Sequence, residues 1–181
     1  MASPKEGVAK IQDALARLAD VDRELRVDLQ FTVPGLAKRH REHLAVATVS
    51  QEWRNLAAKL SAPEAIPAKD AFSQEFDHLV TDVRTMITHM GDTSNLILDP
   101  DLDSYYLMDV TLLALPQTQD RLAQAMQYGY RALRHGGPTP EEKVQLAVDA
   151  ALLQESDIDR VTGSSQTADF SNGQRGIPAT D

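Results

Sequence analysis

Apolar residues recur every three or four positions along most of the 181-residue chain, with charged and polar residues between them. This spacing places the apolar side chains on one face of an α-helix. Aromatic residues make up only 5% of the chain, and β-branched residues rarely alternate with polar ones, which argues against β-strands. We therefore predict an all-α protein, an up-and-down bundle of four to five long helices joined by short loops. The stretches with helical spacing are 4–29, 36–60, 72–98, 100–133 and 140–161.

Proline and glycine mark where these helices are expected to begin, bend and end. Val33-Pro34-Gly35 predicts a break after the first helix, because proline donates no N–H and glycine relaxes the backbone. Gly136-Gly137 is expected to end the fourth helix, and Thr139-Pro140-Glu141-Glu142 is a capping sequence that starts the fifth. Pro116 leaves the carbonyl of Leu112 without its helical partner, which predicts a kink near that residue.

The expected domain organisation follows from where the helical pattern stops. Residues 1–161 are expected to form one helical bundle with a shared core. Residues 162–181 are rich in Gly, Ser, Thr and Asn, and their only large apolar residues are Phe170 and Ile177. We therefore predict a disordered polar tail over 162–181.

Charge and composition limit the classes of partner. The chain has 18 Lys and Arg against 27 Asp and Glu, a net charge of −9, which would repel nucleic acid or an anionic membrane surface. It has no cysteine, which removes disulfides, thiolate metal sites and cysteine nucleophiles. No apolar run is long enough for a signal peptide or a membrane span. We therefore expect a soluble chain with no nucleic-acid partner, which meets a membrane only through flanking segments absent from this sequence.

Two motifs suggest metal binding, and each is incomplete. Asp99-Pro100-Asp101-Leu102-Asp103 has carboxylates at alternating positions, as a calcium loop does, but the glycine and the glutamate that such a loop needs later are missing. Capping of a helix that starts at Asp99-Pro100 accounts for these carboxylates instead. Glu75 and His78 have the Glu-x-x-His spacing of di-iron bundles, which need a second copy that this chain lacks. We expect no metal and no cofactor, and a carboxylate-bridged metal protein is the third hypothesis.

A basic segment, His40-Arg41-Glu42-His43, follows Lys38 and Arg39. Two imidazoles three residues apart on a helix could share a ligand. The surrounding positive charge disfavours a cation, so the segment is interpreted as a solvated basic face, with an anion contact as the alternative. The sequence contains no phosphate-binding glycine loop, serine nucleophile elbow or paired thiol motif. We therefore expect that the protein is not an enzyme.

One segment resembles part of a known class of protein. The sixteen residues SNLILDPDLDSYYLMD (94–109) resemble a segment that recurs in the helical extracytoplasmic input domains of bacterial transmembrane receptors, namely methyl-accepting chemotaxis proteins and sensor histidine kinases. The similarity extends through Leu115-Pro116 toward Leu122, and a fainter copy lies at ESDIDRV (155–161). It covers about residues 70–161. Family members usually continue with further helices, whereas this chain turns polar after Val161.

The resemblance implies a sensory module on the periplasmic side of the inner membrane, flanked by membrane helices and followed by cytoplasmic signalling domains. Such a module would bind an unknown small molecule and pass a helix displacement to an output domain absent from this chain. We expect a homodimer, with the ligand where the third and fourth helices meet. An acidic rim favours a cationic or hydroxyl-rich ligand. The candidate ligand-binding residues are Arg84, Asn95, Asp99, Asp103, Tyr105, Tyr106 and Asp109.

A second hypothesis uses the same helices without a small-molecule ligand. The amphipathic faces would pack as a structural or dimerisation bundle that transmits force or the signal of a partner. The carboxylates near Asp99 would then serve only to cap a helix. Tyr105 and Tyr106 occupy consecutive positions, which diverge by about 100° on a helix, so one ring is expected in the core and the other at a rim or pocket. The alternative is that both rings pack beside neighbouring helices.

Overall fold

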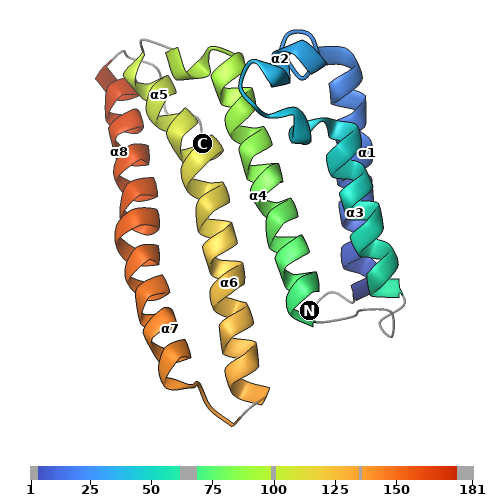
Figure 1. Cartoon of the computed structure of the whole chain (residues 1–181). Helices are drawn as coiled ribbons and strands as arrows, with labels where there is room; N and C mark the ends of the chain where they lie inside the picture. Colours follow the sequence, from blue (N-terminus) through green and yellow to red (C-terminus); the bar gives the residue numbers. More distant parts are fainter. Residues whose placement is uncertain (1–3, 62–68, 99–100, 135, 175–181) are drawn as a thin grey trace. The chain divides into compact units, whose positions relative to one another are not determined.

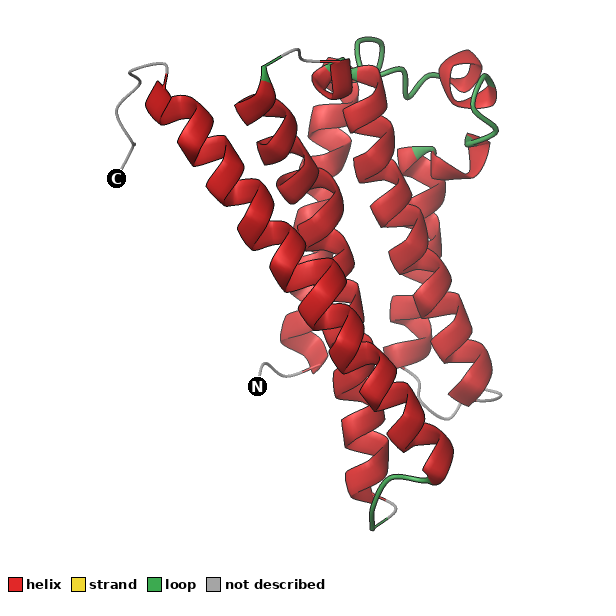
Figure 2. Ribbon diagram, turned by 90° about the vertical axis from the view of Figure 1, so that its left-hand side faces the viewer, coloured by secondary structure: helices red, strands yellow, loops and turns green. Residues whose placement is uncertain are grey.

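The computed structural model describes residues 4–61, 69–98, 101–134 and 136–174. These residues lie in helices or in the loops and turns between them, which confirms the all-α class for this part of the chain (Figure 2). None of the helices formed by these residues is long and apolar enough to cross a membrane. The chain divides into two compact units, Met1–Ser94 and Asn95–Asp181, where the sequence pattern indicated one helical domain followed by a tail.

Within its described residues, the first unit is built on three long helices, α1 (Pro4–Leu25), α3 (Val46–Ser61) and α4 (Lys69–Thr93). α1 and α4 run in the same direction, and α3 runs opposite to both (Figure 1). Their apolar faces meet in a core that contains most of the large apolar residues of the periodic pattern. The buried members of this core are Phe31, Leu36, Leu44, Val46, Val49, Trp53, Leu56, Ala57, Leu79 and Met86.

The connection between α1 and α3, residues 26–45, differs from the continuous helix predicted over 36–60. It contains the short helix α2 (Val33–Ala37) and the 3-10 helix η1 (Glu42–Leu44). Thr32 caps α2, because its Oγ1 accepts a hydrogen bond from the backbone N–H of Gly35 at 3.2 Å. Gly35 lies so close to the preceding loop that a Cβ on it would be 2.3 Å from the carbonyl oxygen of Gln30. The predicted break at Val33-Pro34-Gly35 is confirmed, and only glycine fits at its third position.

The second unit is a hairpin of two long helical segments, preceded by the 3-10 turn η3 (Leu96–Leu98). The two segments run antiparallel, with α5 packed against α8 and α6 against α7 (Figure 1). Each segment consists of two α-helical parts with a π-helical turn between them. The first segment is α5 (Leu102–Met108), η4 (Asp109–Ala114) and α6 (Leu115–Arg134), and the second is α7 (Pro140–Leu152), η5 (Leu153–Ile158) and α8 (Asp159–Gln174).

The ends of the two segments that meet at the hairpin turn follow the signals in the sequence. α6 ends at Arg134, and Gly136 and Gly137 in the turn have φ angles of 80° and 142°, which favour glycine. Thr139 Oγ1 accepts a hydrogen bond from the N–H of Glu142, and the Glu142 carboxylate accepts one from the N–H of Thr139. The predicted capping box at the start of α7 is therefore confirmed.

A π-helical turn interrupts each of the two segments. Pro116 donates no N–H and frees the carbonyl of Leu112, and at Leu112, where the sequence predicts a kink, the structure has the π-helical turn η4. η5 forms without a proline, and no local signal in the sequence announces it. A π-helical turn adds one residue to the helix, so the side chains after it are rotated relative to those before it.

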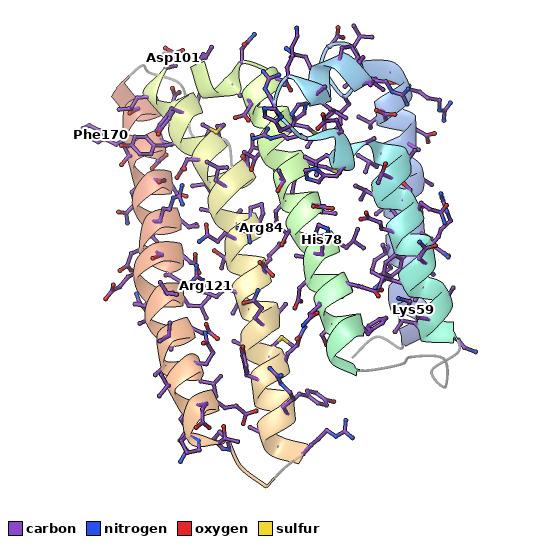
Figure 3. All side chains as sticks on the ribbon, in the orientation of Figure 1. Lys59, His78, Arg84, Asp101, Arg121 and Phe170 are labelled. Carbon is purple, nitrogen blue, oxygen red and sulfur yellow. The ribbon has the colours of Figure 1, made fainter. Side chains whose placement is uncertain are left out.

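The prediction of a disordered tail over 162–181 is wrong for residues 162–174, which belong to α8. Ser164 and Ala168 lie one helical turn apart and are buried. Their small side chains let α8 pack closely against α5, and this packing stabilises the helix without large apolar residues. Phe170, by contrast, is exposed and points away from α5 (Figure 3). Residues 175–181, including Ile177, lie outside the described part of the chain.

Alanine in place of Gly35 tests how tightly α2 packs on the preceding loop. The added Cβ would meet the carbonyl of Gln30, so Gly35→Ala should lower the free energy of unfolding by about 1–3 kcal/mol in urea titrations followed by circular dichroism. Gly129→Ala on α6 is the matched control, because nothing lies within 4 Å of a Cβ there. It should raise stability by about 0.5–1 kcal/mol. A Gly35→Ala protein as stable as the wild type would contradict the close contact.

Candidate functional site

The segment that carries the resemblance, residues 94–109, leads from η3 into α5. Asn95 is exposed and has a left-handed φ of 60°. Asp101 is the N-cap residue of α5, although its side chain makes no capping hydrogen bond, and Asp103 is buried in the first turn. Asp99 and Pro100, where the sequence predicts the helix to start, lie outside the described residues. This corner therefore presents one left-handed asparagine and a run of acidic residues at the beginning of a helix.

The two adjacent tyrosines contact each other. Their ring centroids are 5.5 Å apart, and the rings meet edge to face with an interplanar angle of 78°. Tyr105 is 43% exposed and Tyr106 is half-buried, so neither ring lies in the fully buried core that the sequence analysis expected for one of them. Consecutive positions on α5 diverge by about 100°, and two rings of this size can still meet edge to face.

Asp109, the last residue of this segment, is buried at the start of η4 and binds a residue of the other long segment. Arg160 of α8 donates hydrogen bonds from Nε and Nη2 to the two carboxylate oxygens, and the Nε–Oδ2 distance is 3.0 Å. The hydrogen bond to Asp109 is the main reason that the pKa of Arg160 is raised, while burial opposes it and the charges of Asp109, Tyr105 and Asp157 add to it. Arg160 therefore stays charged, and Asp109 has a protein partner in this structure.

A second ion pair joins the same two segments, but here the arginine belongs to the first segment and the aspartate to the second. Arg121 of α6 (Figure 3) places Nε 2.8 Å from Oδ2 of Asp157 in η5. The side chain of Asp157 is 1% exposed and that of Arg121 is 14% exposed. The N–H is poorly aligned with the oxygen, and neither carboxylate oxygen of Asp157 has a well-formed hydrogen bond. Charge attraction across a buried interface therefore holds this pair, and removing either partner would leave the other without its ion-pair partner.

The two ion pairs are built in the same way. In each, an aspartate in a π-helical turn binds an arginine on a regular α-helix of the other segment. The pair Asp109–Arg160 also joins residues 94–109 to residues 155–161, the two stretches that carry the resemblance. We call these two pairs the hairpin ion pairs.

Sequence analysis missed Arg121 and did not connect the two stretches. The position of Arg121 could have indicated that it lies in an interface. It is seven residues after buried Ala114 and eleven before buried Ala132, which places all three on the same face of the helix. A charged residue on a face that is otherwise buried calls for an opposite charge on the partner element. The identity of that partner depends on the register of the hairpin, which a local pattern does not contain.

Of the seven predicted ligand-binding residues, Arg84 lies on α4 in the first unit (Figure 3), and Asp99 lies outside the described residues. The other five belong to the second unit. Within the second unit the fold brings Tyr105, Tyr106 and Asp109 onto α5 and the start of η4. The role of these residues in ligand binding stays a prediction.

A groove of about 320 Å³ lies between α3 and α4 in the first unit. An ion pair between Lys59 of α3 and Glu75 of α4 spans it, and His78 Nδ1 lies 3.6 Å from Oδ1 of buried Asp82 (Figure 3). Asp82 also approaches His43 Nε2, at 3.7 Å. The Glu-x-x-His pair of the sequence analysis thus has protein partners, and no group of three acidic or histidine side chains in the described part of the chain is arranged to hold a metal ion. The groove is lined by Glu52, Asn55, Leu56, Lys59, Glu75 and His78.

His40, Glu42 and His43 are exposed, as the interpretation of segment 40–43 as a solvated basic face requires, but the segment is not one continuous helix. His40 has a left-handed φ of 53°, which interrupts the helix, and His43 lies in η1. Arg41 donates a hydrogen bond from Nη1 to Oδ2 of Asp92 on α4 at 2.8 Å. The segment is therefore folded back onto α4, and its arginine binds a carboxylate of the same chain.

Charge removal at Arg121 tests whether the second hairpin ion pair stabilises the fold. Arg121→Gln should lower the free energy of unfolding by about 3–5 kcal/mol, because buried Asp157 loses the arginine with which it is paired. The double variant Arg121→Met/Asp157→Leu should recover most of this loss, since it removes both charges. Arg134→Gln, at an exposed position near the end of α6, is the control and should change stability by less than about 0.5 kcal/mol. Equal losses in the two Arg→Gln variants would refute a structural role for the pair.

Comparison of the chain with protein-family models, with curated proteins and with solved structures gives no match. The functional interpretation therefore rests on the geometry of the two units and on the residues that carry the resemblance. Of these features, the hairpin ion pairs are the most specific, because they require four charged residues on two segments to be matched in register.

Proposed function

We propose that this chain is the ligand-sensing input module of a bacterial transmembrane signalling receptor. In this proposal a displacement of one long segment of the second unit along the other carries the signal to an output domain. The periplasmic location, the up-and-down bundle and the homodimer expected from the sequence belong to the same proposal. The single observation that supports it most is the arrangement of the hairpin ion pairs, each of which binds an aspartate of a π-helical turn across the hairpin.

In this proposal, the buried charges favour discrete registers of the hairpin over a continuous movement of one segment along the other. Moving α8 along α5 by a fraction of a turn would separate Arg160 from Asp109 while both remain inside the interface, which is costly. A movement that re-pairs the charges, or that carries them to solvent, avoids this cost. The π-helical turns each hold one extra residue, and shifting that residue along the helix changes the side-chain register without breaking the whole helix.

The α5 corner remains the proposed ligand site, and the first hairpin ion pair suggests how binding would be coupled to movement. A small cation, such as an amine, would compete with Arg160 for Asp109, beside the exposed ring of Tyr105. Release of Arg160 would weaken the register in which α5 and α8 pack. A ligand that favours the second register by about 1.4 kcal/mol would change the ratio of the two states tenfold.

A thermal-shift screen of amino acids, organic acids, amines and inorganic ions tests direct ligand binding. We expect at least one class of compound to raise the unfolding midpoint of the wild-type protein by mass action. The increase should vanish in Tyr105→Ala and persist in Tyr130→Ala, where an exposed tyrosine of α6 is removed instead. The absence of any response across the screen would count against sensing by direct binding.

The absence of cysteine allows the movement itself to be measured. Spin labels at Leu107→Cys on α5 and Ser165→Cys on α8 occupy exposed positions on the two segments. The distance between the labels should change when an active compound from the screen is added, and not when an inactive one is added. An unchanged distance with a bound ligand would contradict the displacement mechanism.

The second candidate function, a structural or dimerisation bundle, is favoured by the apolar residues that the second unit leaves exposed. A second copy of the chain could cover them. Sedimentation equilibrium over a wide range of protein concentration should then show a dimer that dissociates in Leu133→Ser. A concentration-dependent dimer together with a flat ligand screen would favour this function over sensing. The exposed apolar residues of the second unit include Leu98, Leu102, Leu107, Met126, Tyr130, Leu133, Val144 and Phe170.

A further inference from the structure

We propose that His89 makes the first unit sensitive to acid, because protonation of its buried imidazole releases the connection 26–45 from α4. This inference concerns a different unit from the hairpin ion pairs and does not depend on the proposed function.

His89 lies on α4 and is 0% exposed. Its ring meets that of Phe31 edge to face, with the centroids 4.6 Å apart. Nη1 of Arg41 lies 3.3 Å from Nδ1 of His89, and the same Nη1 donates to Asp92. A guanidinium only donates hydrogen bonds, so Nδ1 must be the acceptor, and the ring is neutral with its proton on Nε2. The buried Nε2 has no well-aligned hydrogen bond.

The groups around His89 favour its neutral form. Burial is the main reason that the pKa of His89 is lowered from its ordinary value of about 6.5. The backbone of Gln30 and that of Leu29 raise this pKa, whereas the positive charges of Arg41 and Arg39 lower it further.

The remaining charges around the core do not offer His89 a counter-ion. Asp92 is bound to Arg41, and Asp22 of α1 is bound to Arg26. The side chains that α3 buries in the core are Val46, Val49, Trp53, Leu56 and Ala57, none of which titrates. Protonated His89 would therefore be a second positive charge beside Arg41 inside the core.

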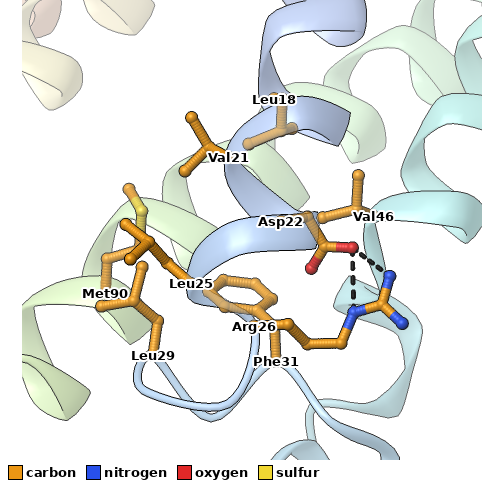
Figure 4. A pocket seen from close by; sticks show the side chains of 9 residues that line it. All are labelled: Leu18, Val21, Asp22, Leu25, Arg26, Leu29, Phe31, Val46 and Met90. Carbon is orange, nitrogen blue, oxygen red and sulfur yellow. Dashed lines mark hydrogen bonds and ion pairs between the residues drawn. The ribbon is translucent and has the colours of Figure 1, made fainter.

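The connection 26–45 is the part of the first unit that we expect to detach from α4 when His89 is protonated. It contains two non-glycine residues with left-handed φ angles of 53°, Gln30 and His40. Phe31 also lines a small cavity with Leu18, Leu25 and Met90 (Figure 4), so its ring borders unfilled space. Departure of Arg41 and Phe31 from α4 would relieve the charge repulsion while α3 and α4 keep their shared apolar contacts.

The direction of the pH effect follows from the lowered pKa. The folded state holds His89 in its neutral form. The contribution of His89 to stability is therefore complete above the pKa that the histidine has in the unfolded chain, about 6.5. The contribution is lost as the pH falls from that value through the folded pKa. Each unit by which the folded pKa is lowered corresponds to a tenfold change in the opening equilibrium of the connection.

Amide hydrogen exchange between about pH 7.5 and about pH 5 tests the proposal in the full chain. The reporters are the amides of Leu36, Arg41 and Leu44, which donate to the carbonyls of Thr32, Leu36 and Arg41. Once rates are corrected for intrinsic pH dependence, their protection should fall in acid by about tenfold per unit of pKa lowering. Amides in the middle of α3 and α4 should keep their protection.

His89→Gln keeps an acceptor for Arg41 but cannot gain a proton, so the acid-dependent loss should disappear. His40→Asn is the matched control, because it removes an exposed histidine at a left-handed position that asparagine tolerates, and the loss should persist. His43 and His78 cannot explain a loss in acid, since their protonation would give buried Asp82 a positive partner.

Nuclear magnetic resonance of the His89 ring in the wild-type protein keeps the proposal testable if His89→Gln does not fold. The ring should titrate below the ordinary histidine value, and the loss of amide protection in the connection should follow the same curve. An ordinary pKa for His89, a loss of protection that is equal throughout the first unit, or the same loss in a folded His89→Gln variant would each overturn the proposal.

Discussion

The second unit depends on matching buried charge across a hairpin. Asp157 is almost fully enclosed between the two long segments, and a carboxylate in that position is tolerated only beside a positive partner. Arg121 supplies the partner, and Arg160 does the same for Asp109. A shift of one segment along the other would separate each aspartate from its arginine inside the interface, which is costly. The ion pairs therefore specify the register, and the small residues of α8 permit the close packing that encloses them.

The two π-helical turns contain the aspartates of the hairpin ion pairs and are therefore part of the same charge matching. An uninterrupted α-helix advances 100° per residue, and its interior face is occupied by the residues that pack best. Asp109 is the first residue of η4 and Asp157 lies within η5, and each meets an arginine of the other segment in the interface. The extra residue in each turn rotates the part of the segment that follows it. A helix modified in this way can change register locally, which is the property that the proposed signalling movement uses.

The first unit buries a polar side chain, His89, without pairing it with an opposite charge. His89 is enclosed in its neutral form, with Arg41 donating to it and Phe31 against its ring. A neutral imidazole is far cheaper to bury than a carboxylate, but its charge can change within the physiological range of pH. The connection that covers it is held by Gly35, whose lack of a side chain permits the contact with Gln30, and by the ion pair between Arg41 and Asp92.

Local features of the amino-acid sequence were sufficient to predict the all-α class, the break at Val33-Pro34-Gly35 and the capping box at Thr139. Each of these depends on backbone chemistry within a few residues: helical spacing, the missing N–H of proline, or a hydroxyl beside an unpaired amide. Residues 162–174, the role of Arg121, the π-helical turn without proline and the fold-back of Arg41 onto α4 could not be read in the same way. They result from packing and charge pairing between residues as many as 51 positions apart, and the energies that place them exist only once the partner helix is present.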